Sequence, residues 1–278
     1  GSGEVKLSYR LQVENFAGLM DGESRVSPAA VGPAYPGGSV PSSLRSYAHI
    51  VELTWKPSDL ATLFITLPFY ERTLTQYVVA PDGSLAQPYR VSVRGFGDLI
   101  LNGLYRVFAD DIHRVHLNLG LGLPSGSTNE SSEAPAGITG VTAGSLQRLP
   151  YVMQLGSGTL SLRPGFTYNG LYRRVFWGAQ VLGVLQAGTN SEGYKLGNQY
   201  EATAWVGRPW TEWFRTSFRL EWQQWFNPTG EDDQLDPALS PLADPLLQAG
   251  RRLDVLFGVD FNVTGGRFKG TRISIEGG

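Results

Sequence analysis

The clearest pattern in the sequence is an alternation of apolar and polar residues over the stretch 251–263. Every odd-numbered position from Leu253 to Val263 is apolar, and most even-numbered positions are polar or Gly. A period of two places these two sets on opposite faces of a β-strand. The stretch is longer than the usual five or six residues of a soluble strand. It is long enough for a tilted strand to cross a bilayer, which takes about 9–11 residues.

The same alternation recurs along the chain. It predicts strands over 4–17, 44–56, from 60 onward, 98–108, 113–123, 159–168, 172–186, 197–208, 213–226, 251–263 and 272–276. The ragged segment 70–94 is expected to form a protruding hairpin that turns at Pro81-Asp82-Gly83. Asn169-Gly170 has the composition of a tight hairpin turn.

The connections between these strands alternate between long and short. Long, Gly-, Pro- and Ser-rich loops follow the first, third, fifth, seventh and ninth strands, and short turns follow the others. Outer-membrane barrels have long extracellular loops and short periplasmic turns. The sequence therefore predicts an all-β fold, a transmembrane antiparallel up-and-down β-barrel that forms a single domain over residues 1–278. Its first strand is expected to rise from the periplasm.

The expected strand number is about twelve. Eleven strands can be recognised, whereas bacterial single-chain barrels have an even number. An open edge in lipid leaves backbone groups unpaired at a cost of several kcal/mol each. We therefore expect a closing strand beyond residue 278, and the alternative is a strand overlooked within 70–94.

Composition narrows the possibilities further. No apolar run approaches the roughly 18 residues of a membrane helix, which argues against a helical membrane protein. The absence of Cys removes disulfides and thiolate metal sites, and a net charge of −2 without a basic cluster argues against nucleic-acid binding. Aromatic residues are expected to form two interfacial girdles. The periplasmic girdle would contain Trp55, Tyr105, Tyr168, Trp210 and Trp213, and the outer one Tyr47, Phe69, Trp225 and Phe226.

If the apolar face meets lipid, the polar face lines the lumen. The candidate pore-lining residues are Arg10, Glu14, Glu52, Arg106, His116, Arg163, Arg174, Glu201, Arg215, Arg219, Glu221, Asp254 and Asp260. Charges of both signs allow two interpretations. They could line a water-filled pore and set its selectivity, or they could form salt bridges that fill a closed barrel.

The loops 18–43 and 227–250 are open to two interpretations as well. They could fold inward as a constriction or outward as a contact surface for a protein partner. The acidic residues Glu231, Asp232, Asp233 and Asp236 lack the spacing of a calcium-binding loop. We interpret them as a solvated acidic loop and expect neither a metal site nor a cofactor.

Catalysis is not expected. The chain has only His49, His113 and His116, and His49 has the parity of a lipid-facing residue. A lipid-facing His beside a Ser would suit an outer-membrane phospholipase, but no accompanying motif is present.

Three glycine-rich motifs in the central third carry a family resemblance. They are Gly95-Phe96-Gly97-Asp98 before a strand containing Tyr105-Arg106, a strand that ends in Leu123-Pro124-Ser125-Gly126, and Gly156-Ser157-Gly158. Together they resemble the outer-membrane family described as the putative MetA-pathway of phenol degradation. The resemblance implies an outer-membrane barrel that moves small hydrophobic compounds, and it implies no catalytic residues.

The expected function is therefore an outer-membrane channel or diffusion pathway for small molecules, hydrophobic ones included, in a Gram-negative bacterium. The alternative is a non-conducting scaffold barrel that anchors partner proteins in that membrane. The expected contacts are membrane lipid, a small-molecule solute and, through the loops or lumen, a protein.

Overall fold

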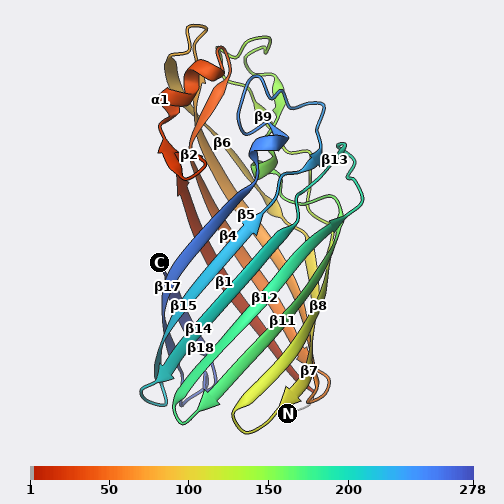
Figure 1. The fold of residues 1–278 in the computed structure, drawn as a ribbon, viewed down its shortest axis with the longest axis vertical. Coiled ribbons are helices and arrows are strands. Elements are labelled where there is room, and N and C mark those ends of the chain that lie inside the picture. Colours follow the sequence, from red (N-terminus) through yellow and green to blue (C-terminus); the bar gives the residue numbers. More distant parts are fainter. Residues whose placement is uncertain (1–2) are drawn as a thin grey trace.

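The computed structural model describes residues 3–278, so Gly1 and Ser2 of the expected domain lie outside the described residues. A large antiparallel sheet of 12 strands curls into a tall wall, and loops with three small two-stranded sheets gather at one end of it (Figure 1). The expected all-β, antiparallel architecture is confirmed. Within residues 3–278, no helix is both long and apolar enough to cross a membrane.

Strands that follow one another in the chain are neighbours in the wall. The wall strands are β1 (Glu4–Ala17), β4 (Ser39–Lys56), β5 (Ala61–Val79), β6 (Leu85–Phe96), β7 (Leu99–Ala109), β8 (His113–Leu123), β11 (Leu160–Tyr172), β12 (Val175–Ala187), β14 (Gln199–Pro209), β15 (Phe214–Trp225), β17 (Gly250–Asn262) and β18 (Arg272–Gly277). The loops contain β2 (Leu19–Asp21), β3 (Ser24–Val26), α1 (Pro28–Val31), η1 (Gly32–Ala34), β9 (Ser131–Glu133), β10 (Leu146–Arg148), η2 (Tyr151–Met153), β13 (Tyr194–Lys195), β16 (Thr229–Gly230) and η3 (Pro245–Leu247).

Strands β6 and β7 share one place in the wall. Both pair with β5, β6 along its upper part and β7 along its lower part, so that Phe69 pairs with Phe96 and Thr66 with Ile100. The break between them is at Gly97 and Asp98. The upper parts of β5 and β6 form the predicted protruding hairpin, whose turn contains Gly83 at a φ of 83°. This prediction is confirmed, and the segment adds no further position around the wall.

The two faces of the wall differ as the alternation predicted. On the outer face Leu7 is 70% exposed and Leu253 is 66% exposed. No other part of the protein covers these side chains, as expected for a surface that faces lipid. Trp55, Tyr105, Trp210 and Trp213 are about half exposed near the short-turn end. Trp225 was wrongly placed in the outer girdle: its indole faces inward and donates to the Gln248 carbonyl at 2.8 Å.

The predicted turn at Asn169-Gly170 is also wrong. Strand β11 continues to Tyr172, and the hairpin turns at Arg173 and Arg174, with Arg173 at a φ of 57°. Gly170 pairs with Trp177 inside the ladder, where an added Cβ would lie 2.2 Å from the indole. The glycine therefore makes room for a ring on the next strand and does not supply turn geometry.

The edges of the sheet are β1 and β18. Both strands run upward from the short-turn end, so they do not form an antiparallel pair with each other. The closing strand that the sequence led us to expect between them stays a prediction. Side chains nevertheless connect the upper parts of β17 and β1. Arg252 Nη1 lies 3.1 Å from Glu14 Oε1.

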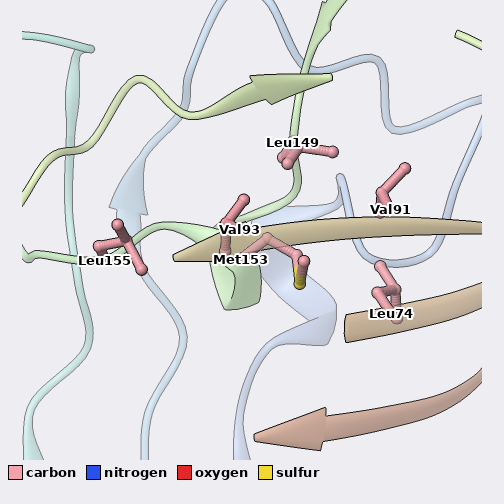
Figure 2. Packing of buried hydrophobic residues seen from close by; sticks show 6 residues of the cluster. All are labelled: Leu74, Val91, Val93, Leu149, Met153 and Leu155. Atoms are coloured by element: carbon pink, nitrogen blue, oxygen red, sulfur yellow. The ribbon is translucent and has the colours of Figure 1, made fainter. Parts of the chain in front are cut away.

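The long loops form a packed cap over the upper end of the wall. We define the cap as residues 124–159, 188–198 and 226–249. Leu149, Met153 and Leu155 of the cap pack against Leu74 of β5 and against β6 (Figure 2). Arg72 of β5 donates from Nη1 to the Val152 and Gln154 carbonyls at 2.9 and 2.7 Å. The loops after β8, β12 and β15 thus fold over the wall, and the hydrophobic core of the protein lies there.

Candidate functional site: the lumen

The inner face of the wall carries most of the residues that the sequence singled out. Twelve of the thirteen candidates lie there, namely Arg10, Glu14, Glu52, Arg106, His116, Arg163, Glu201, Arg215, Arg219, Glu221, Asp254 and Asp260. Arg174 lies in the tight turn that precedes β12, where it is exposed at the short-turn end. Its place in the pore lining stays a prediction.

Several charged candidates form ion pairs along β15, β17, β18 and β1, mostly with arginine or glutamate side chains outside the candidate set. Asp260 accepts hydrogen bonds from Arg272 Nη2 at 2.7 Å and Nε at 3.0 Å, and Arg215 lies 3.6 Å away. Asp260 is buried, so its charge needs these partners. Further up, Arg252 lies 2.7 Å from Asp254. This part of the wall is therefore an ionic ladder that joins its strands.

A further ionic pair joins β15 to β18. Arg219 Nε donates to Glu276 Oε1 at 3.0 Å, with both side chains about one-third exposed. Its guanidinium also lies over the Trp205 ring, 5.8 Å from the centroid. Such a contact contributes roughly 0.5–1 kcal/mol at an exposed site.

The opposite part of the inner face is lined mainly by amides and hydroxyls. Thr167 Oγ1 accepts hydrogen bonds from Asn118 Nδ2 at 2.9 Å and Gln180 Nε2 at 2.7 Å. Thr66 donates to Glu52 Oε2 at 3.1 Å. The amides and hydroxyls among these groups are neutral, so they can bond a solute or water without requiring a counter-charge.

A cavity of about 330 Å³ lies against this part of the face. Glu52, Arg163 and Glu201 contribute charge to its lining, and amides contribute most of the remaining polar groups. Its apolar lining comes from Phe64, Leu104, Leu182, Val184 and Trp225. Its volume is near the lower end for small-molecule sites, about 300–1,000 Å³.

The alternation alone did not identify these apolar lining residues. Leu104, Leu182 and Val184 have inward parity but aliphatic side chains, so they interrupt the polar face of their strands. Leu256 does the same on β17. The sequence did contain a signal for an amphipathic lumen: apolar residues at positions where the alternation places the polar, inward-facing residues.

The three glycine-rich motifs meet in space beside the break between β6 and β7. Asp98 Oδ1 accepts from the Gly126 N–H at 3.0 Å, and Oδ2 accepts from the Ser157 N–H at 2.8 Å and hydroxyl at 2.6 Å. An added Cβ at Gly126 or Gly156 would collide with the other's backbone at 2.7 and 2.4 Å. The motifs therefore form one clasp between the wall and the cap, with Asp98 at its centre.

A buried ionic cluster connects the three cap segments. Arg148 is 4% exposed; its Nε lies 3.1 Å from Asp232 Oδ2, and its Nη2 bonds the Glu192 carboxylate. Asp232 is therefore not part of a solvated acidic loop, and that prediction is wrong for this residue. Within residues 3–278, no group of three or more His, Cys, Asp or Glu is placed to hold a metal ion.

Two tyrosines pack beside this cluster. The Tyr151 and Tyr194 rings meet edge to face, with centroids 4.8 Å apart, and the Tyr151 hydroxyl accepts from the Asp232 N–H at 3.2 Å. Burial raises the pKa of Tyr194 to about 12, so its phenol stays neutral at physiological pH.

The histidines lie in different surroundings. His49 is on the outer face, where its Nδ1 and the Tyr9 hydroxyl are hydrogen-bonded at 2.8 Å, and its ring meets Phe69 edge to face. His113 stacks on Tyr168 near the short-turn end. His116 pairs in register with Arg106 on the inner face.

Comparisons with known proteins agree with this architecture. The sequence model of the family described as "Putative MetA-pathway of phenol degradation" matches residues 31–276. The solved COG4313 outer membrane channel from Pseudomonas putida F1 has a similar fold, with a TM-score of 0.59 at 13% identity over 99% of this chain and 87% of that chain. A Pseudomonas aeruginosa FadL homologue gives a TM-score of 0.48 at 9% identity, over 97% and 65% of the two chains. No curated protein matches by sequence.

Proposed function

The chain belongs to the family described as "Putative MetA-pathway of phenol degradation", and from this membership and the lumen we propose that it is an outer-membrane channel for small molecules, hydrophobic ones included. The observation that carries the proposal is the cavity of about 330 Å³ on the inner face of a wall whose outer face is apolar. The likeness in fold to the COG4313 outer membrane channel supports it.

The lining favours solutes with an apolar body and one or two hydrogen-bonding groups. Leu104, Leu182 and Val184 offer apolar contact, and Asn102 and Gln180 offer amide donors and acceptors. The ion-paired side chains of the ladder lie outside this lining, and their charges already have partners. No step of this passage requires catalysis, so we assign no enzymatic role.

The orientation follows from the loops. Long connections and the cap would face the cell exterior, and the short turns would face the periplasm of a Gram-negative bacterium. Outer-membrane lipid would then cover Leu7, Leu253 and the other exposed apolar side chains.

The test is conductance of the full-length mature protein in a planar bilayer. We expect a steady conductance whose preference for cations increases in Arg106→Glu and Arg219→Glu, because each change reverses a charge on the inner face. Arg208→Glu is the matched control, since Arg208 lies beside Trp210 near the periplasmic end of the wall. Equal selectivity in all four proteins would contradict an open lumen lined by these residues.

The packed cap favours a second candidate, a non-conducting scaffold that anchors a partner protein. Its core and its buried Arg148 cluster cover the upper end of the wall. A folded protein that stays silent in the bilayer would favour this scaffold, and crosslinking from the exposed cap residues would then seek the partner.

A further inference from the structure

The outer face of β4, β5 and β6 carries a basic patch just above the apolar band. We define the patch as Arg45, Arg90 and Arg94, which are all exposed. The inner face of the same hairpin is covered by the cap, where Leu74 and Val93 are buried. The patch is thus on the side of the sheet that would meet the membrane.

The strand register places the patch around a pair of hydroxyls. Arg45 pairs with Thr73, Thr73 pairs with Ser92, and Arg94 lies two residues further along β6. With strands about 4.8 Å apart and a rise of about 3.4 Å per residue, the Arg45 and Arg94 Cα atoms are roughly 12 Å apart. Thr73 Oγ1 and Ser92 Oγ lie between them, 3.0 Å from each other.

These guanidinium groups have few protein partners. Arg45 Nε donates to Asn15 Oδ1 at 2.8 Å, which leaves its two terminal nitrogens free. Among the described residues, Arg90 and Arg94 have neither an ion pair nor a hydrogen bond from their side chains. Glu71, which pairs in register with Arg94, forms no ion pair with it. By contrast, Arg251 at the top of β17 is paired with Glu23.

The patch begins where the apolar band ends. Phe69 and Phe96 pair in register and pack edge to face, 5.2 Å between centroids. The next outward residues on the two strands are Glu71 and Arg94. Apolar rings below and unpaired arginines above match a lipid whose acyl chains lie beneath a phosphorylated head group.

We propose that this face binds a phosphorylated saccharolipid of the outer leaflet, of the lipid A type, with its phosphates on Arg45, Arg90 and Arg94 and an acyl chain against Phe96. Arginine suits this role because its planar fork bonds phosphate oxygens in a bidentate manner. The Thr73 and Ser92 hydroxyls bond the sugar or phosphate oxygens between them. The proposal rests on the outer-membrane location that is part of the proposed function.

The test measures retention of purified diphosphorylated lipid A by the detergent-solubilised full-length protein, using native mass spectrometry. Each arginine changed to Gln is expected to weaken binding about tenfold, since Gln cannot donate the bidentate, charge-assisted hydrogen bonds of a guanidinium to a phosphate. The triple variant Arg45→Gln, Arg90→Gln, Arg94→Gln should lose detectable binding. Arg251→Gln is the matched control on the same outer face. Circular dichroism checks that every variant is folded.

Four results would overturn the proposal. They are equal retention by the triple variant and the native protein, equal retention of dephosphorylated lipid A, full displacement of lipid A by millimolar inorganic phosphate, and equal binding of phosphatidylglycerol vesicles. The last would show a general attraction to anionic lipid. Because conductance is measured separately, a silent protein that still retains lipid A would contradict the channel and leave the lipid site standing.

Discussion

Single glycines on the inner face of the wall make room for aromatic rings from the neighbouring strand. Gly178 pairs with Trp205, and Arg219 lies over the same indole. Gly207 pairs with Phe176, and Arg215 lies 5.7 Å from that ring centroid. Each glycine thus makes room for a ring, and each ring helps to position an arginine in the lumen.

At Gly178 this arrangement gives a stability prediction. An added Cβ would lie 2.3 Å from the Trp205 ring and 2.7 Å from the Tyr168 carbonyl oxygen, which is backbone and cannot rotate away. Gly178→Ala should lower the free energy of unfolding by about 1–3 kcal/mol. Urea titration in lipid vesicles measures it. Gly183→Ala on the same strand is the control, because its nearest atom is 3.7 Å away. Equal effects of the two changes would refute the packing argument.

At the scale of elements, short turns depend on local side-chain bonds. Asp110 in the β7–β8 turn accepts from the His113 N–H at 2.6 Å and the Ile112 N–H at 2.8 Å. These bonds lower the pKa of Asp110 below its ordinary value, because they favour the charged carboxylate. The turn is therefore closed by a charge that acid can remove.

The lowered pKa of Asp110 gives a pH dependence with a definite sign. The carboxylate stabilises the fold above its unfolded pKa of about 3.9, and this contribution is lost as the pH falls through the lower folded value. As the pH falls below 5, the Asp110→Asn variant should lose less free energy of unfolding than the native protein does. Urea unfolding at a series of pH values measures this difference. Asp111→Asn is the control, and identical acid profiles for native protein and Asp110→Asn would disprove the role.

At the scale of the whole molecule, the wall and the cap are stabilised by different interactions. The wall relies on its strand ladder and inner-face ion pairs, whereas the cap relies on a small apolar core, the Asp98 clasp and the Arg148 cluster. Removing one partner of a buried ion pair costs about 3–5 kcal/mol, because a buried charge is left unpaired. The cap is thus the part that a single substitution can loosen.

Arg148→Ala should loosen the cap and leave the wall intact. It removes the partner of both Asp232 and Glu192, so residues 124–158 should be cleaved faster in limited proteolysis. Conductance in the bilayer should rise if the cap restricts the lumen. Lys56→Ala is the control, since Lys56 pairs with Asp59 at 3.4 Å in an exposed turn. Unchanged proteolysis would show that the cluster does not hold the cap.

The sequence by itself determined the strands, their faces and the alternation of loop lengths, because a period of two repeats in nearly every wall strand. It also singled out twelve residues that now lie on the inner face, since parity assigns a side without tertiary information. It failed at Gly170, because a glycine that accommodates a ring looks the same in the sequence as a glycine in a turn. Only the tertiary structure decided that the loops form a cap, that Asp232 is buried against Arg148, and that Asp98 joins three distant motifs. The Arg148–Asp232 contact alone joins residues 84 positions apart, and no local pattern records which partners will meet.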